Sequence, residues 1–151
     1  MISKILVPTD GSETANKSVK YAAGLAKQLG AKITLLSVID INAGDFFAQT
    51  VSAVNSPTHL IEPIEDYLRQ AADAYIKEGE RICKKNGVQS KKVIRSGHPV
   101  EEIVNEAVKS KVNLIVMGSH GRSALKAAFL GSVTFGVIHK DTKIPVLVVR
   151  K

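Results

Sequence analysis

The sequence predicts an α/β fold: an open parallel sheet of five strands with helices on both faces. Short apolar runs alternate along the chain with longer segments of helical periodicity, which is typical of strand–helix units. The fourth run is continuously apolar, as expected when helices cover both faces of a sheet. We expect a single domain over residues 1–151, because this length suffices for one continuous core.

An apolar run and a set of turn residues predict the first strand and helix. Residues 4–7 form the run, and Pro8 closes it. Residues 10–12, Asp-Gly-Ser, then supply turn and helix-capping groups, and the helix is expected to end at Gly30. The second strand is predicted over residues 33–38.

The least regular region runs from residue 39 to about residue 63. Pro57 and Pro63 are expected to interrupt any helix there. A connection of this length is typical of a lid, a contact surface or a mobile segment, and the sequence does not decide among them. A long helix is predicted from about residue 64, ending at Asn86–Gly87.

The remaining elements continue the alternation. A third strand is predicted within residues 91–95, followed by a helix with Pro99 at its first position. A fourth strand is predicted over residues 112–117, a last helix from residues 131–132, and a fifth strand over residues 146–149. Ligands of open parallel sheets bind beyond the carboxyl ends of the strands, so the residues that follow each strand are candidates for a site.

Composition narrows the classes of function. The formal net charge is +7, but the lysines are scattered along the sequence and aromatic residues make up only 5%, so a small anionic ligand is favoured over nucleic acid. No stretch reads as a membrane span, and the N-terminus has no signal-peptide pattern. Cys83 is the only cysteine, which rules out an internal disulfide and indicates a cytoplasmic protein.

A glycine pattern follows the predicted fourth strand, at Gly118, Gly121 and Gly131. Glycine lets backbone amides approach a ligand closely and adopt positive φ, and consecutive amides make a nest for an anion. A helix that begins at residue 132 adds unpaired N–H groups. The same segments carry hydroxyls and a guanidinium that suit phosphate, on Ser119, Ser132, Thr134 and Arg122. The alternative is a plain turn followed by a helix cap.

Other nucleotide and metal motifs are missing from the sequence. The pattern is neither a Walker A loop nor a G-x-G-x-x-G fingerprint. The four histidines show no metal-ligand spacing with one another or with Cys83, so we expect no protein-held metal. Asp10 could serve only as a helix cap, and His120 could be an orienting or merely exposed side chain instead of a proton-transfer group.

Five segments together resemble the universal stress protein family over nearly the whole chain. They are "ILVPTDGSE", "GHPVEEIV", "LIVMGSHG", "LGSV" and "IPVLVVR". Nucleotide-binding members of this family carry glycine, two residues, glycine, nine residues, then glycine followed by Ser or Thr. Gly118, Gly121, Gly131 and Ser132 match that pattern completely.

The resemblance implies a strand order of 3-2-1-4-5 and an adenine nucleotide, ATP, at the carboxyl ends of the strands. The segment after the first strand matches the family's adenosine contacts, Val38 matches an adenine-packing position, and the two glycine segments match the ribose and phosphate contacts. The matching positions are Pro8, Thr9, Asp10, Val38, Met117, Gly118, Ser119, His120, Gly121, Arg122, Gly131, Ser132, Val133 and Thr134.

The resemblance also implies a nucleotide-dependent regulator of the stress response, with protein partners that the sequence does not identify. In the family the last strand mediates homodimer formation, so residues 146–150 are expected at a dimer interface. A Mg²⁺ or Mn²⁺ ion would be held through the phosphates. No carboxylate of the motif is an evident activator of water, so we expect no catalytic residue and at most slow ATP hydrolysis.

Two other functions remain open. One is a slow ATPase or an adenylate-using enzyme of related architecture, although "VPTDGSE" stands where pyrophosphate-forming relatives have a Ser-Gly-Gly loop. The other is an interaction module that binds no nucleotide, against which the intact glycines argue.

Overall fold

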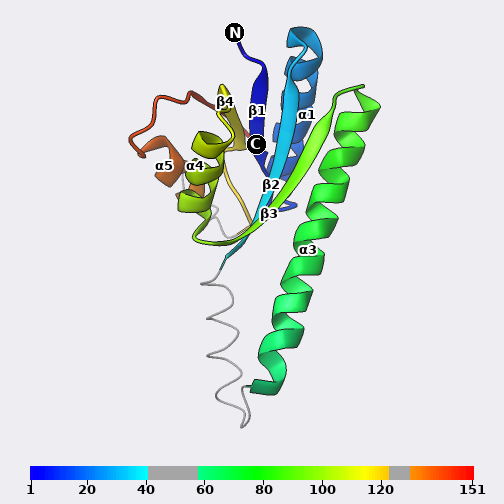
Figure 1. Cartoon of the computed structure of the whole chain (residues 1–151), viewed down its shortest axis with the longest axis vertical. Coiled ribbons are helices and arrows are strands. Elements are labelled where there is room, and N and C mark those ends of the chain that lie inside the picture. The colour runs from blue at the N-terminus through cyan, green and yellow to red at the C-terminus, as the bar shows by residue number, and fades with distance from the viewer. Residues whose placement is uncertain (41–57, 123–129) are drawn as a thin grey trace.

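The computed structural model describes residues 1–40, 58–122 and 130–151, with only the helical backbone described at residues 58–62 (Figure 1). Most of the predicted irregular region therefore lies outside the described residues. The described elements alternate between strand and helix as predicted. They are β1 (Lys4–Pro8), α1 (Glu13–Leu29), β2 (Lys32–Asp40), α3 (Thr58–Lys85), β3 (Ser90–Gly97), α4 (Pro99–Lys109), β4 (Leu114–Gly118), α5 (Ser132–Ile138) and β5 (Val146–Val149).

The five strands form one parallel sheet in the order β3-β2-β1-β4-β5, which confirms the predicted order. Ile5 of β1 lies between Ile33 of β2 and Leu114 of β4. The winding reverses between β1 and β4, so their carboxyl ends flank the crevice where such sheets bind ligands.

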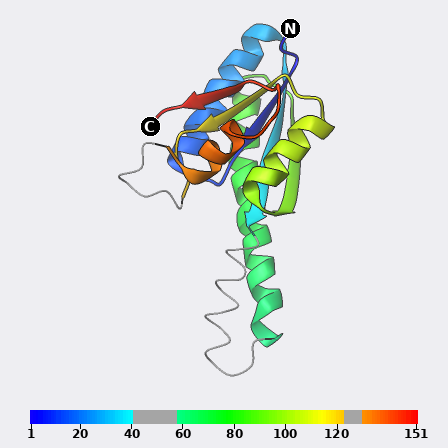
Figure 2. The same cartoon turned by 90° about the vertical axis from the view of Figure 1, so that its left-hand side faces the viewer.

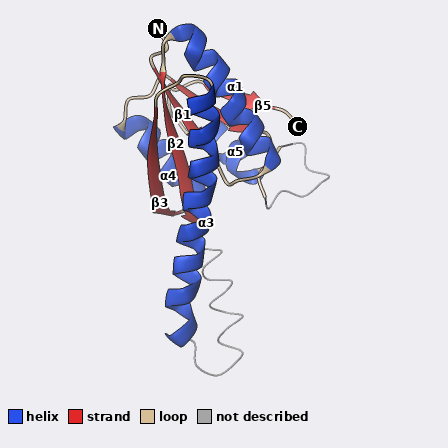
Figure 3. Cartoon of the chain, turned by 90° about the vertical axis from the view of Figure 1, so that its right-hand side faces the viewer, coloured by secondary structure: helices blue, strands red, loops and turns tan. Residues whose placement is uncertain are grey.

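Helices cover both faces of the sheet, which explains the continuously apolar strands. Successive residues of a strand point to opposite faces. Ile5 of β1 packs in one cluster with Val19 of α1 and Ile76 of α3, on the face that Figure 3 shows toward the viewer. Leu6 of the same strand packs in a second cluster with Ile103 of α4, on the opposite face (Figure 2).

The turn residues before α1 act as predicted. The Ser12 hydroxyl accepts a hydrogen bond from the amide of Ala15 at 3.1 Å, which caps the helix. Gly30 ends the helix with φ 67°, and its amide donates to the carbonyl of Ala26.

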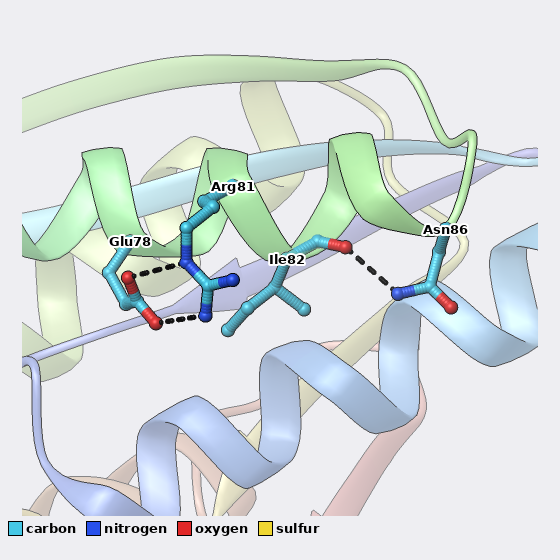
Figure 4. Close-up of polar contacts among 4 residues, drawn as sticks. All are labelled: Glu78, Arg81, Ile82 and Asn86. Carbon is cyan, nitrogen blue, oxygen red and sulfur yellow. Dashed lines mark hydrogen bonds and ion pairs between the residues drawn. The ribbon is translucent and has the colours of Figure 1, made fainter.

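The end of α3 also lies where the sequence predicts it (Figure 4). The Asn86 side-chain amide donates to the carbonyl of Ile82 at 2.8 Å, and Gly87 has φ 70°. One turn earlier, the Arg81 guanidinium binds Glu78 at 2.7 Å. This exposed pair contributes little to stability compared with the buried face of the helix.

The predicted start of α3 is wrong. The helix begins at Thr58, about one and a half turns before residue 64, and Pro63 lies inside it. Pro63 is the sixth residue of the helix, so its missing N–H leaves one helical hydrogen bond unmade, and the helix continues on both sides of it. Along the described parts of the chain, no helix is both long enough and apolar enough to cross a membrane.

Candidate functional site

A cavity of about 320 Å³ opens at the carboxyl ends of β1, β2 and β4, beside the start of α5. Its volume lies at the lower end of the range for small-molecule sites, about 300–1,000 Å³. Thirteen of the fourteen predicted site residues line it. These are Pro8, Thr9, Asp10, Val38, Met117, Gly118, His120, Gly121, Arg122, Gly131, Ser132, Val133 and Thr134.

Ser119 is the predicted residue that does not line the cavity. Its side chain is buried, and its hydroxyl lies 2.9 Å from Nδ1 of His120. Its amide donates to the carbonyl of Val149 on β5 at 2.8 Å. Ser119 thus supports the loop from behind, where we predicted a direct phosphate contact.

The two glycine segments are hydrogen-bonded to each other. The amide of Gly131 donates to the carbonyl of Ser119 at 2.7 Å, and the Thr134 hydroxyl donates to the carbonyl of Gly118 at 2.7 Å. Both segments therefore face one cavity although they lie ten or more residues apart in the sequence.

Asp10 joins the end of β1 to the loop after β4. Its Oδ2 accepts a hydrogen bond from the amide of Arg122 at 2.7 Å, and its Oδ1 accepts from the amide of Ser12 at 3.0 Å. Its carbonyl accepts from Nε of Arg122 at 2.6 Å. Asp10 is therefore both a turn residue before α1 and an anchor for the cavity wall. Its predicted contact with the nucleotide stays a prediction.

Close approach within the protein explains the glycines of this motif. A Cβ on Gly118 would lie 2.7 Å from Cγ2 of Thr14, and one on Gly121 would lie 2.5 Å from Oδ2 of Asp10. A Cβ on Gly131 would lie 3.1 Å from the carbonyl oxygen of Ser119. These contacts are too short for a side chain to fit without movement of its neighbours.

The expected positive φ does not occur at Gly118, Gly121 or Gly131. The glycine with positive φ beside the site is Gly11, at 75°, and a Cβ there would collide with the ring of Tyr75. Sequence alone does not distinguish a glycine that makes room for a ligand from one that makes room for the chain itself.

Arg122 lies exposed at the rim of the cavity. Its guanidinium carbon is 4.7 Å from the centroid of the Tyr75 ring, and its Nε is bound to the carbonyl of Asp10. A cation–π contact of this kind is worth about 0.5–1 kcal/mol at an exposed site. The guanidinium is thus positioned by the protein, with its charge at the mouth of the cavity.

Five further lining residues were not predicted: Ala15, Leu36, Asp40, Pro99 and Ile103. Leu36 and Ile103 are almost fully buried and, with Met117, make one side of the cavity apolar. Leu36 and Asp40 flank the predicted Val38 at a spacing of two residues. The period of a β-strand could therefore have identified both.

The described residues place no group of three or more His, Cys, Asp or Glu side chains where they could hold a metal ion. Cys83 lies buried in the core, and burial raises the pKa of its thiol to about 11. A thiol of that pKa stays protonated at neutral pH and is a poor nucleophile.

Comparison with known proteins agrees with this geometry. The family model described as "Universal stress protein family" matches residues 1–150. The chain belongs to the universal stress protein family. The sequence of universal stress protein MJ0577 of Methanocaldococcus jannaschii is 38% identical, over 100% of this chain and 96% of that protein. Universal stress protein YxiE of Bacillus subtilis is 34% identical, over 99% of this chain and 100% of that protein.

Solved universal stress proteins share the fold of this one. A structure of MJ0577 superimposes with a TM-score of 0.85 at 34% identity, covering 100% of this chain and 97% of the other. A universal stress protein solved in complex with cAMP superimposes with a TM-score of 0.68 at 23% identity, covering 99% and 97%. At that identity the second likeness concerns the fold alone.

Proposed function

We propose that this universal stress protein binds ATP in the cavity between the glycine segments and acts as a nucleotide-dependent regulator of the stress response. One observation carries the proposal: two segments rich in backbone donors and hydroxyls meet through direct hydrogen bonds beside an apolar wall. An adenine nucleotide has the matching division into an apolar base and an anionic tail.

The base and ribose would lie near the ends of β1 and β2. Val38 and Met117 offer apolar contacts there, and Pro8, Thr9 and Asp10 form the adjoining wall. Thr9 is fixed, because its amide donates to the carbonyl of Leu36 at 2.8 Å. The adenine would therefore meet a preformed surface, which lowers the entropy lost on binding.

The phosphates would lie between residues 118–122 and 131–134. The first amides of α5 have no partner within the helix, and the Ser132 side chain is exposed beside them. Arg122 adds positive charge at the rim. A Mg²⁺ or Mn²⁺ ion would fit as a phosphate-bound cation, because hard cations accept oxygen ligands from phosphates and water.

Ser132→Asp tests this assignment without weakening the fold. A carboxylate at the start of α5 is favourable to the helix but repels a triphosphate beside it. We expect ATP affinity, measured by isothermal titration calorimetry, to fall by about tenfold or more. Ser132→Ala is the matched control and should change the affinity by less than about threefold, the loss of one neutral hydrogen bond. Equal ATP affinity of Ser132→Asp and the wild type would contradict the proposed phosphate position.

The proposal does not assign a catalytic residue. Both carboxylate oxygens of Asp10 accept hydrogen bonds from backbone amides, which suits an anchor better than an activator of water. Ground-state binding of a triphosphate gives affinity without rate. We therefore expect at most slow ATP hydrolysis. Phosphate release at an ordinary enzymatic rate, on the order of 10 per second, would contradict this expectation.

We further propose a cytoplasmic homodimer that pairs through residues 146–150. β5 is an edge strand, and its four residues are all partly exposed in the isolated chain. An apolar edge of this kind is an aggregation hazard unless it is covered. Sedimentation equilibrium should give a dimer mass for the wild type and a monomer mass for Val148→Lys, since a lysine on an edge strand opposes pairing. A wild-type monomer at high micromolar concentration would refute the dimer.

A further inference from the structure

A second and larger cavity, of about 790 Å³, lies at the opposite end of the sheet. It is an open groove at the amino ends of β1, β2 and β3, bordered by the C-terminal end of α4. It shares no lining residue with the cavity between the glycine segments. The groove is therefore a separate site from the proposed nucleotide cavity.

The groove is strongly basic. Seven of its sixteen lining residues are Lys or Arg, and Glu106 is its one acidic residue. The exposed lysines come from three strand starts and from the end of α4. Five of them are Lys4, Lys32, Lys91, Lys109 and Lys111, and the sixth is Lys92, whose ammonium lies 3.3 Å from Oδ1 of Asp73.

The Glu106 carboxylate already interacts with two neighbouring side chains. Its side chain is only 5% exposed, lies 3.1 Å from the Arg95 guanidinium and accepts a hydrogen bond from the Ser110 hydroxyl at 2.7 Å. It therefore neutralises Arg95. Apart from Lys92, the five other exposed lysines form no ion pair with a described carboxylate. Five positive charges thus face the groove without a negative partner in the described chain.

The groove also runs along an unpaired backbone edge. β3 is the outer strand of the sheet, and among the described residues its eight positions pair only with β2. Alternate amides and carbonyls of an edge strand point away from the sheet and can accept another strand. Lys91, Val93 and Arg95 line the groove at the two-residue spacing of one strand face. Backbone pairing and side-chain charge are therefore offered together.

We propose that this groove binds an extended acidic peptide segment of a protein partner. The segment adds alongside β3, and its carboxylates meet the unpaired lysines. A nucleic acid fits less well, because no aromatic side chain lines the groove for base stacking. Val93 and Val112 instead offer apolar contacts suited to the alternate side chains of a strand.

Fluorescence anisotropy with the full-length protein tests the proposal. The probe is a fluorescein-labelled peptide of alternating Glu and Val. One control is a peptide of alternating Lys and Val, and the other is an oligothymidylate with the same net negative charge as the probe. The double variant Lys32→Glu, Lys91→Glu should weaken binding of the Glu-Val peptide by about tenfold at low salt. A matched double variant, Lys20→Glu with Lys140→Glu, makes the same change in net charge outside the groove and should bind within about twofold of the wild type.

Three results would overturn the proposal. Equal loss in both double variants would show attraction to net charge alone. Tighter binding of the oligothymidylate through the same lysines would show a nucleic-acid groove. Amide chemical-shift changes on peptide addition should map to residues 90–97; changes confined to residues 118–122 would place the peptide in the nucleotide cavity. Lys32→Gln with Lys91→Gln gives the same comparison if the charge reversal impairs folding.

Discussion

The two ends of the sheet differ in how their cavities are built. At the carboxyl ends, the chain folds closely on itself: Gly118 touches Thr14, Gly131 touches Ser119, and hydrogen bonds of 2.6–2.8 Å fix the walls of a small cavity. At the amino ends, exposed lysines surround an open groove more than twice as large. The first end presents a small cavity with fixed backbone geometry. The second offers charge and an unpaired strand edge.

This difference predicts different responses to mutation. A small increase of volume at Gly118 or Gly131 must displace main-chain atoms, because atoms of the Thr14 or Ser119 backbone lie 3.1 Å from an added Cβ. At the amino ends most side chains have room, so charge matters more than size, and salt screens its effect over about 10 Å at 0.1 M. Substitutions at the two ends therefore test whether volume matters more at one end and charge at the other.

Gly118→Ala has the largest expected effect. The added Cβ would lie 2.7 Å from Cγ2 of Thr14 and 3.1 Å from that residue's carbonyl oxygen, so α1 must shift from the end of β4. Overpacking of this kind costs about 1–3 kcal/mol. Urea unfolding should therefore show a lower midpoint at unchanged slope.

Gly24→Ala is the matched control for that substitution. A Cβ at Gly24, a half-buried position of α1, meets nothing within 4 Å. Alanine favours a helix over glycine by about 1 kcal/mol, so this variant should be more stable than the wild type. If both glycine variants were equally stable, close packing at the carboxyl ends would not be the reason for Gly118.

The fold could be predicted from the sequence because its signals are local. Apolar runs, the Ser12 cap and the glycine stops each act within a few residues, and they marked the elements to within a few positions. The start of α3 was missed because Pro63 was expected to interrupt any helix, whereas the helical backbone continues through it to Thr58. Residues 41–57, for which a lid, a contact surface or a mobile segment was considered, lie outside the described residues.

The candidate site was predictable only in outline. The spacing of Gly118, Gly121 and Gly131 identified the two segments that meet in the structure. The close contacts that explain Gly118 and Gly121 are with Thr14 and Asp10, more than a hundred residues away in the sequence, and no local signal reports such contacts. The basic groove was missed for the same reason: lysines that are scattered in the sequence are gathered by the fold.

Glu106→Gln tests the role of charge at the amino ends, and we expect it to lower stability by less than Gly118→Ala does. Burial disfavours its ionised form, but the Ser110 hydroxyl and the Arg95 guanidinium outweigh burial, so the pKa of Glu106 lies below its ordinary value of 4.5. Replacing the carboxylate removes a charge-assisted hydrogen bond from a buried position, which should cost about 1–2 kcal/mol at neutral pH. Glu65→Gln, on the exposed face of α3, is the control and should change stability by less than about 0.5 kcal/mol.

The pH dependence of that loss identifies its cause. A carboxyl group whose folded pKa is depressed stabilises the protein above its unfolded pKa, and this contribution disappears as pH falls through the folded pKa. The gap in unfolding free energy between wild type and Glu106→Gln should therefore stay constant from about pH 8 to pH 5 and narrow below about pH 4.5. Urea unfolding at a series of pH values measures it. A gap that persisted unchanged into acid would mean that the shape of the side chain, and not its charge, matters at this end too, and the contrast between the two ends would fail.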